Sequence, residues 1–475
     1  MAHENTSPWL RQVKSARPVI TLSEDADSDV AVVGGGISGV ACSYFLLRDT
    51  NLSVILMEKS RVAHGATGHN GGQAVAAFEH NMLGLCERFG EDLVSAGQKA
   101  INSAWGLLYS IIEESGIDGG LQEVTAYLAL SSIEDVLLML RERQLMDRLG
   151  LPKEVILLAK DVAAAIPKEY QSLFKSVPRR ELDELLLTRD GNYLCTLASR
   201  MGLINSALFC EDLVSWMLKR HPGRFRVYEN TPVKSITFGS RAGGSSGNGP
   251  GCSAVLQTGK NVVNAKHTIL CTNGYGDLEI EGADASIKAA VRGVVGFMIG
   301  YMNEKERPPA ASVYFSSGRS GPSDAYYYLA RRRYVDGLKK ELISAGGPDR
   351  PLGKGERYDP EGMPMLGEYY SRIEDFCRKT TTDTAGASGD AQRDFSWNGL
   401  MGYTSSGVRV IGPDPACPSL IYNMGCNGIG ILPSIYAGKR VVQAIMGEML
   451  APSVFDPASA SLRIDAKPII CKYST

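Results

Sequence analysis

The chain has 475 residues, a formal net charge of −2 and 44% hydrophobic residues. This length predicts two or three domains, or one large interleaved unit with a sizeable core. The 50 lysines and arginines are matched by 52 aspartates and glutamates, which excludes a polycationic surface and a nucleic-acid partner. The 52 glycines follow no Gly-X-Y period. They indicate a backbone that turns tightly, or approaches another group closely, at several places.

Cysteine and histidine spacing bears on compartment and metal binding. The ten cysteines contain no CxxC pair, and the six histidines show no HxxxH or HExxH spacing. This pattern predicts reduced thiols in a cytoplasmic protein and no metal site. Residues 1–29 lack the apolar segment of a signal peptide, and no continuous apolar run of about 20 residues occurs. We therefore expect no membrane span.

The apolar and glycine patterns predict alternating strands and helices. A strand at 30–33 leads through a glycine turn into a helix over 40–48, and a second strand follows at 53–57. Further helices are predicted at 80–116, 133–150, 205–219 and 433–449. Further strands are predicted at 224–229, 233–238, 253–258, 267–271, 325–329 and 420–423, with polar loops at 240–251 and 378–394.

These elements predict an α/β fold in which a strand-rich domain is inserted into a domain assembled from discontinuous segments. The discontinuous domain is expected to take residues 29–120, 201–285 and 396–450. The inserted domain, built on an antiparallel sheet, is expected to take residues 121–200 and 286–395. Residues 1–28 then form an N-terminal extension, and residues 451–475 form a C-terminal tail.

A dinucleotide-binding pattern follows the first predicted strand. Gly34, Gly36 and Gly39 have the spacing that allows a tight turn, close approach to a pyrophosphate and close helix packing. The helix start at Ile37 and Ser38 supplies free N–H groups and the positive end of a dipole. Glu58 and then Lys59 end the second strand, 24 residues after Gly34. An acidic residue there accepts hydrogen bonds from a ribose diol and disfavours NADP.

The loop after Glu58 separates FAD from NAD. A long loop of small residues is expected beneath a flavin, whereas a simple NAD dehydrogenase has no use for one. The loop residues that we expect to contact the cofactor are Ala66, Thr67, Gly68, His69, Asn70, Gly71 and Gly72.

These motifs together resemble the FAD-dependent D-amino-acid-oxidase-like (DAO) superfamily, and most closely the γ-glutamylputrescine-oxidoreductase type and its fungal relatives. The resemblance runs over residues 28–448 and implies a Rossmann-like FAD-binding domain of the GR2 type. It includes segments 231–233, 267–275, 397–404 and 425–431. From these segments it implies a second group of cofactor-binding residues: Val233, Thr272, Asn273, Gly274, Gly425, Asn427, Gly428, Ile429, Gly430 and Ile431.

The resemblance also implies a reaction. Members of the superfamily oxidise the C–N bond of a primary or secondary amine or an amino acid, with hydride transfer to flavin N5 and hydrolysis of the imine. Reoxidation by O2, giving H2O2, is expected. The candidate catalytic residues are Tyr327, Arg331, Trp397 and Asn427. Noncovalent FAD is expected, with covalent attachment through His69 as the alternative, because a related branch links its flavin through a histidine in this loop.

Three other functions remain open. A dehydrogenase of the same fold would pass its electrons to a carrier or a quinone. An NAD(P)H-using monooxygenase would need a second nucleotide fingerprint, which the sequence lacks. A flavoprotein without catalytic activity would hold FAD as a scaffold or binding module.

Overall fold

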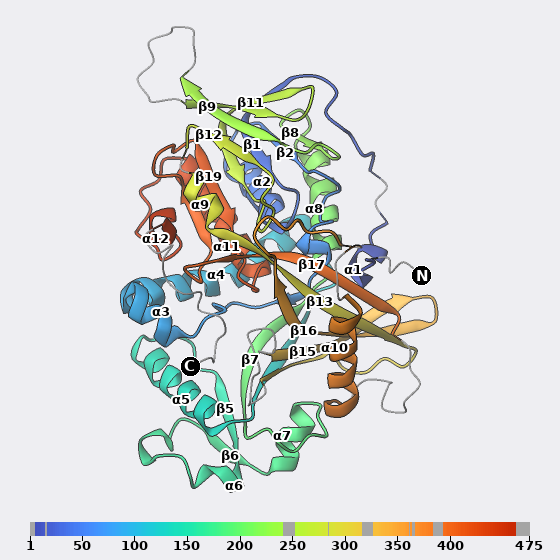
Figure 1. The fold of residues 1–475 in the computed structure, drawn as a ribbon, viewed down its shortest axis with the longest axis vertical. Coiled ribbons are helices and arrows are strands. Elements are labelled where there is room, and N and C mark those ends of the chain that lie inside the picture. Colours follow the sequence, from blue (N-terminus) through green and yellow to red (C-terminus); the bar gives the residue numbers. More distant parts are fainter. Residues whose placement is uncertain are drawn as a thin grey trace.

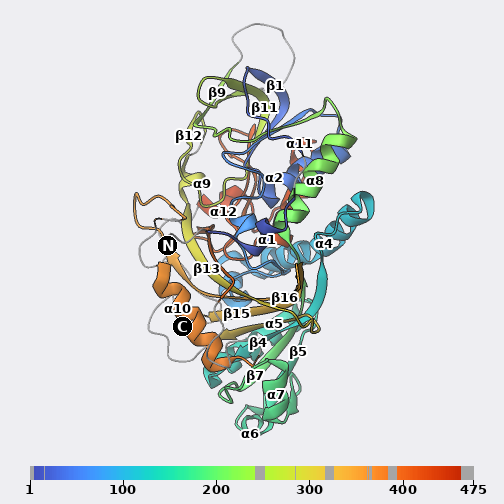
Figure 2. The same ribbon diagram turned by 90° about the vertical axis from the view of Figure 1, so that its right-hand side faces the viewer.

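The computed structural model describes residues 5–14, 17–240, 252–283, 285–315, 326–360, 362, 366–382 and 393–461. Its elements form two sheets stacked end to end along the long axis (Figures 1 and 2). Residues 241–251 and 383–392 of the two expected loops lie outside the described residues, as does the tail after residue 461.

The first sheet has a parallel centre, in the order β8-β2-β1-β11 with β19 beside β11. Val30 to Val33 are buried apolar residues, as expected for a strand covered on both faces. Val33 pairs with both Met57 and Leu270, so these strands end at one edge of the sheet. The strands of this sheet are β1 (Ala26–Val33), β2 (Val54–Met57), β8 (Phe225–Tyr228), β9 (Ser235–Ser240), β10 (Cys252–Gln257), β11 (Val262–Leu270), β12 (Glu279–Glu281), β18 (Val410–Pro413) and β19 (Leu420–Met424).

Long helices pack around this sheet. The expected helix over 80–116 is two helices, because Gly90 adopts φ 86° between them. Helix α11 lies so close to α2 that a Cβ on Gly438 would come within 2.9 Å of the Ala41 carbonyl carbon. The helices of this layer are α2 (Ile37–Asp49), α3 (Met82–Phe89), α4 (Glu91–Ser115), α8 (Ser206–Arg220) and α11 (Ile431–Ile445).

The second sheet is mainly antiparallel, in the order β17-β13-β16-β15-β14-β4-β7-β5-β6, with β3 beside β7. Helix α10 (Leu366–Thr380) packs on β13 and β16. The boundary expected at residue 396 falls inside β17, which pairs with β13 rather than with the first sheet. The strands are β3 (Gln73–Ala74), β4 (Gln122–Leu130), β5 (Val155–Ala159), β6 (Lys175–Val177), β7 (Cys195–Leu203), β13 (Val291–Asn303), β14 (Ala310–Phe315), β15 (Tyr326–Asp336), β16 (Lys339–Pro351) and β17 (Phe395–Thr404).

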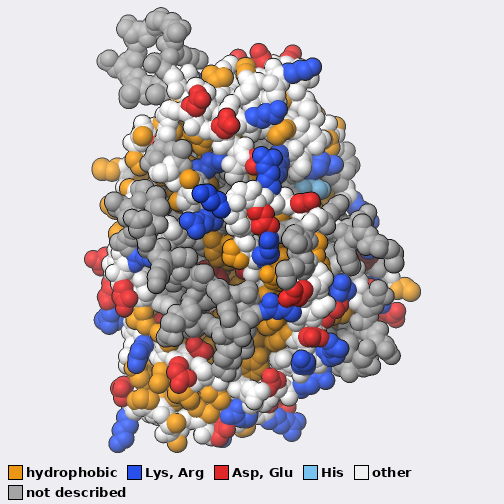
Figure 3. Space-filling model, in the orientation of Figure 1, with side chains coloured by type: hydrophobic (Ala, Val, Ile, Leu, Met, Phe, Trp, Pro, Cys, Tyr) orange, Lys and Arg blue, Asp and Glu red, His pale blue; other side chains and the backbone are white. Residues whose placement is uncertain are grey.

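Shorter elements complete the fold and confirm the expected α/β architecture. The expected N-terminal extension contains a short helix, α1, at the junction of the two sheets (Figure 2). Within the described ranges, no helix is long and apolar enough to cross a membrane. Side chains of both charge signs are interspersed over the face in Figure 3. The remaining elements are α1 (Pro8–Arg11), α5 (Ile133–Arg148), α6 (Lys160–Ala163), α7 (Arg179–Leu185), α9 (Ala285–Ala289), α12 (Pro457–Ser461), η1 (Ala66–Gly68) and η2 (Lys168–Tyr170).

Candidate cofactor and substrate site

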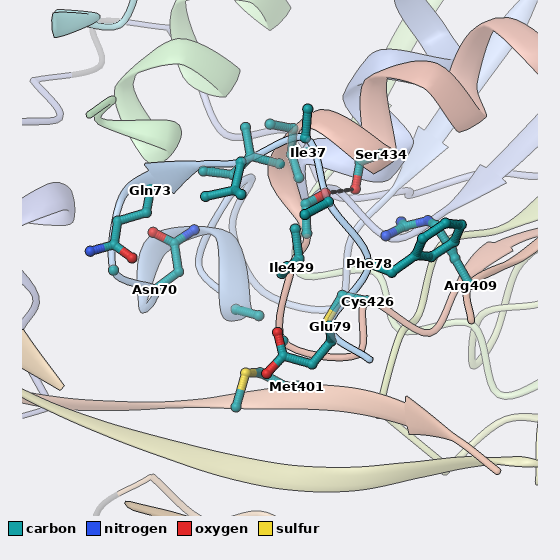
Figure 4. Close-up of a pocket in the computed structure, with 18 of the residues that line it drawn as sticks. Ile37, Asn70, Gln73, Phe78, Glu79, Met401, Arg409, Cys426, Ile429 and Ser434 are labelled. Atoms are coloured by element: carbon teal, nitrogen blue, oxygen red, sulfur yellow. Dashed lines mark hydrogen bonds between the residues drawn. The ribbon is translucent and has the colours of Figure 1, made fainter. Parts of the chain in front are cut away.

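A cavity of about 1290 Å³ lies between the carboxyl edge of the first sheet and one face of the second. Its wall includes residues that follow β1, β2, β11 and β19, because these strands end at the same edge. It also includes the loop after Glu58 and strands β15, β16 and β17 (Figure 4). The cavity therefore joins segments that are far apart in the sequence.

The glycine turn after β1 is tightly packed. Gly34 has φ 109°, and a Cβ there would lie 2.7 Å from the carbonyl oxygen of Cys271. A Cβ on Gly39 would lie 2.0 Å from the Gly34 carbonyl oxygen, so only glycine lets α2 start so close to β1. A Cβ on Gly36 would lie 2.9 Å from Thr67 Oγ1. This backbone cradle at the start of a 13-residue helix fits the pyrophosphate of a dinucleotide.

Glu58 is held rigidly at the end of β2. Its Oε2 accepts a hydrogen bond from the Gly35 amide at 2.7 Å, and its Oε1 accepts one from the Ser60 amide at 3.0 Å. The next residue, Lys59, lies 3.5 Å above the ring centroid of Tyr275, and burial lowers its pKa. Both side chains line the cavity beside the glycine turn, as expected for ribose recognition.

Hydrogen bonds order the small-residue loop. Thr67 Oγ1 accepts from the Ile37 amide at 2.9 Å, which ties the loop to the start of α2. Asn70 Nδ2 donates to Ser206 Oγ at 2.9 Å, and its Oδ1 accepts from the Gly72 amide at 2.8 Å. The loop is thus fixed before any ligand enters.

His69 lies in this loop with both ring nitrogens next to carbonyl oxygens. Nδ1 is 3.0 Å from the Gly65 oxygen, and Nε2 is 3.2 Å from the Asn5 oxygen. Burial lowers the pKa of the ring. The side chain borders the cavity, but its nitrogens have protein partners.

The segment before β1 supports the same loop from outside, which the sequence analysis missed. Trp9 is fully buried, and its Nε1 donates to the Asn70 carbonyl oxygen at 2.6 Å. Ser7 caps α1 by accepting from the Leu10 amide at 3.2 Å. The Ser7-Pro8 start of a helix next to a tryptophan was the available signal.

Two turns, one after β11 and one after β19, form the remaining part of the cavity wall. Asn273 Oδ1 accepts from the amides of Gly425 and Cys426 at 3.2 and 3.0 Å, so the turn after β11 holds the turn after β19. Asn427 Oδ1 accepts from the Thr404 amide at 2.8 Å. Pro433 is the third residue of α11 rather than its first, where its missing N–H is still tolerated.

Most residues expected to hold the cofactor meet at the cavity wall. Those that line it are Gly34, Gly36, Ile37, Ser38, Glu58, Lys59, Ala66, Thr67, His69, Asn70, Gly71, Val233, Thr272, Asn273, Gly428, Ile429, Gly430 and Ile431. Gly39, Gly68, Gly72, Gly274, Gly425 and Asn427 lie behind the wall, where they shape its turns.

The four candidate catalytic residues do not line the cavity. Tyr327 points to the opposite face of β15 and stacks on Phe376 of α10, with ring centroids 4.2 Å apart. Arg331 donates to the Pro308 carbonyl oxygen at 2.8 Å. Trp397 is buried behind the loop, with Nε1 3.2 Å from the Asn70 oxygen, and Asn427 holds a turn. The side chains of all four residues therefore contact other parts of the protein and do not face the cavity.

The residues that do face the cavity near Met401 are acids and tyrosines. Tyr326 and Tyr328, the neighbours of Tyr327, line it, as do Glu79 and Asp349. The hydroxyl of Tyr326 is 3.4 Å from Glu79 Oε1. Figure 4 shows the Glu79 carboxyl group directly beside Met401. Glu79 and Asp349 were not expected at the site from the sequence, and Tyr326 and Tyr328 were not among its candidate catalytic residues.

The two carboxyl groups influence each other. Burial raises the pKa of Asp349 to about 8, and the charge of Glu79 raises it further, against a hydrogen bond with Tyr403. Burial also raises the pKa of Tyr326 well above its ordinary range. At neutral pH Asp349 therefore holds its proton. Across the described ranges, no His, Cys, Asp and Glu cluster could hold a metal ion.

Sequence relatives, a solved structure and a family model all agree with a dinucleotide-binding site in this cavity. γ-Glutamylputrescine oxidoreductase of Escherichia coli is 25% identical over 58% of this chain, although the match spans only 56% of that protein. A probable oxidoreductase, OrdL, of Haemophilus influenzae is 23% identical over 92% of this chain and 87% of its own length. Glycine oxidase from Geobacillus kaustophilus shares the fold, with a TM-score of 0.63, 17% identity and coverage of 91% and 98%. The FAD dependent oxidoreductase (DAO) family model matches residues 29–444, and the chain belongs to this family of FAD-dependent enzymes.

Proposed function

We propose that the protein uses FAD to oxidise the C–N bond of a positively charged primary or secondary amine. Bound FAD supplies a two-electron acceptor, which no side chain can replace. The observation that carries the proposal is the acid–tyrosine cluster of Glu79, Asp349, Tyr326 and Tyr328 at the cavity wall. Carboxylates and aromatic faces in a partly desolvated site attract ammonium groups and repel carboxylates.

The arginines of the cavity wall support an amine over an amino acid. An α-carboxylate is best held by the two-pronged guanidinium of an arginine. Arg143 is bonded to Asp147, and Arg200 is bonded to Glu123. Arg409 is bonded to Ser38, at the glycine turn. Each of the three arginines is thus bonded to another group, and none has a contact with the acid–tyrosine cluster within the described residues.

The same cluster can prepare the amine for oxidation. An ammonium group has no lone pair and cannot give up hydride equivalents from its α-carbon until a proton leaves the nitrogen. Asp349 can accept that proton once it is ionised, above a pKa of about 8, which lies closer to that of an amine than an ordinary carboxyl pKa does. The tyrosine rings exclude water from the reacting groups.

The electron acceptor and the cofactor linkage belong to this proposal. We favour reoxidation by O2 with release of H2O2, and a carrier protein or quinone is the alternative. We favour noncovalent FAD, because both ring nitrogens of His69 are next to backbone carbonyl oxygens. A cytoplasmic location is supported by the eight cysteines whose side chains the structure describes, all of which are free thiols.

Anaerobic mixing tests the reaction. The FAD-loaded protein is mixed with n-butylamine, 1,4-diaminobutane and N-methylbutylamine, and separately with glycine and sarcosine, while flavin absorbance is followed. We expect at least one amine to bleach the flavin and the amino acids to leave it oxidised. Bleaching by amino acids alone would contradict the preference for amines, and no bleaching at all would favour a flavoprotein without this activity. Admission of air then tests O2 as the acceptor through the H2O2 formed.

Two ligands that share a tert-butyl group test the cluster separately from the oxidation reaction. tert-Butylamine and pivalate carry opposite charges, and neither has an α-hydrogen to lose. We expect tert-butylamine to perturb the flavin spectrum and pivalate to have no effect. Glu79→Gln should weaken tert-butylamine binding about tenfold, as expected for loss of a charge-assisted contact. Tyr327→Phe, on the other face of β15, is the matched control and should bind normally.

A further inference from the structure

Arg409 is a buried cation at the other end of the cavity. It lies between β17 and β18, is 5% exposed, and forms part of the cavity wall. Its Nη2 donates to Ser38 Oγ at 2.6 Å, and its Nε donates to Asn423 Oδ1 at 2.8 Å. Figure 4 shows it on the side of the cavity where Ser434 lies.

The partners of Arg409 leave its charge unbalanced. A serine hydroxyl and an asparagine amide are neutral, and Nη1 has no hydrogen-bond partner among the described residues. No ion pair joins Arg409 to a carboxylate in the described part of the chain. Its other electrostatic neighbours are three thiols, Cys42, Cys271 and Cys426. A buried charge without a counter-charge is strongly unfavourable.

Two other buried arginines are paired with acids. Arg440 donates to Asp456 at 2.8 Å, and Arg17 contacts Glu211 and Glu229 at 2.7 Å each. The chain therefore neutralises these buried guanidinium groups within the fold. Arg332 is also buried and has no ion pair within the described ranges, but it lies 4.9 Å above the Trp9 ring centroid and does not line the cavity. Arg409 differs from these three arginines because it borders the cavity without an acid partner, so a counter-charge can reach it from there.

The surroundings of Arg409 favour an anion. Ser38 is the second residue of α2, and Ser434 is in the first turn of α11. Their hydroxyl oxygens are 3.0 Å apart, so the two helices begin side by side. Helix N-termini carry partial positive charge, and two of them next to a guanidinium form a strongly anion-attracting wall.

We propose that Arg409 balances the diphosphate of FAD, so that its charge is neutralised only when the cofactor is bound. This role of Arg409 depends on the FAD dependence of the family and not on oxidation of an amine. It assigns to Arg409 a binding role and no step in catalysis. It also implies that the FAD-free protein carries a buried charge that destabilises it.

Arg409→Met tests this proposal because it should stabilise the FAD-free protein and weaken the binding of FAD. Methionine keeps much of the side-chain length without the charge. The FAD-free variant should melt at a higher temperature than the FAD-free wild type. Its dissociation constant for FAD should increase about 10- to 100-fold, as for loss of a charge-assisted contact. Inorganic pyrophosphate should raise the melting temperature of the FAD-free wild type and leave that of the variant unchanged.

Arg440→Met is the matched control, because it removes an equally buried arginine that already has an acid partner. It should lower the melting temperature and leave the FAD dissociation constant within about twofold of wild type. If Arg409→Met behaves in the same way, the proposal is wrong. Equal stabilisation of wild type and Arg409→Met by pyrophosphate would also overturn it.

A thiolate at Cys42 is the competing source of counter-charge. Asn423 Nδ2 is 3.3 Å from Cys42 Sγ, and hydrogen bonding with Cys271 helps to lower the pKa of the Cys42 thiol against the effect of burial. A thiolate absorbance band in the FAD-free protein that disappears in Cys42→Ser would show that the charge is balanced internally and overturn the proposal. Arg409→Lys, which keeps the charge, provides a variant for the FAD titration if Arg409→Met does not fold. It should bind FAD more weakly than wild type, and unchanged binding would count against the guanidinium.

Discussion

Replacing Trp9 should reveal how strongly the segment before β1 controls the cofactor loop. The Trp9 side chain is fully buried, and truncation of such a side chain costs about 3–5 kcal/mol. Its ring edge packs on Trp397, with centroids 6.2 Å apart, and the Arg332 guanidinium lies 4.9 Å above its centroid. Arg332 Nε and Nη1 have no hydrogen-bond partner within the described residues, so loss of the ring leaves a buried cation less stabilised. We therefore expect Trp9→Ala to reach the upper part of that range.

Trp9→Ala should also make the small-residue loop around Asn70 less rigid. The Trp9 indole donates to the Asn70 carbonyl oxygen at 2.6 Å, so Trp9→Ala should speed FAD release as well as lower the free energy of unfolding. Urea unfolding and FAD fluorescence after dilution measure the two effects. Trp9→Phe keeps the ring and should lose only about 1 kcal/mol.

Trp216→Ala is the control for Trp9→Ala. Trp216 packs on Tyr44 from α8, outside the cavity wall, so its loss should reduce stability without changing FAD release. Equal FAD release from Trp9→Ala and Trp216→Ala would refute the role of the N-terminal segment. An unfolding free energy for Trp9→Ala within about 1 kcal/mol of wild type would refute the packing argument.

Three further expectations concern the cavity wall. Gly39→Ala should abolish FAD binding, because its Cβ would lie 2.0 Å from the Gly34 oxygen, whereas Gly106→Ala in open space on α4 should be neutral or stabilising in FAD titration and melting experiments. The raised pKa of Asp349 gives stability that is complete below its ordinary pKa of 3.8 and is lost as pH rises to about 8. The melting temperature of FAD-free Asp349→Asn should therefore exceed that of the FAD-free wild type by an amount that grows as the pH rises through that interval. A difference in melting temperature that does not change with pH would contradict the raised pKa of Asp349. Acid precipitation should leave FAD in the supernatant, whereas colour in the pellet would indicate a covalent link at His69.

The cofactor end could be predicted because its determinants are local in sequence. Gly34, Gly36 and Gly39 follow a strand and start a helix, and Glu58 ends the next strand. Each residue type is dictated by backbone geometry or by one hydrogen bond. Such constraints can be recognised in a single sequence, because they require little knowledge of which distant segments come together.

The substrate end could not be predicted in the same way. Alternation along β15 separates Tyr327 from its neighbours, but three successive tyrosines do not tell which face of the strand is covered by α10. Asp349 follows two glycines and a proline and precedes an arginine and a second proline, which is typical of a turn, yet it belongs to the long strand β16. Arg331 was expected among the catalytic residues and instead lies close to the buried Glu341. These assignments depend on long-range sheet pairing.

The two ends of the cavity also differ in charge, which no composition could show. Arg409 and two helix N-termini lie at the dinucleotide end, and Glu79 and Asp349 lie where β15, β16 and the turn after β19 meet. The whole chain has a net charge of only −2, so the separation is local. A dinucleotide diphosphate and an ammonium group would each be attracted to one end and repelled from the other. If that is how the cavity sorts its ligands, Arg409→Met should weaken FAD binding without altering tert-butylamine binding to the loaded protein, and Glu79→Gln should do the reverse.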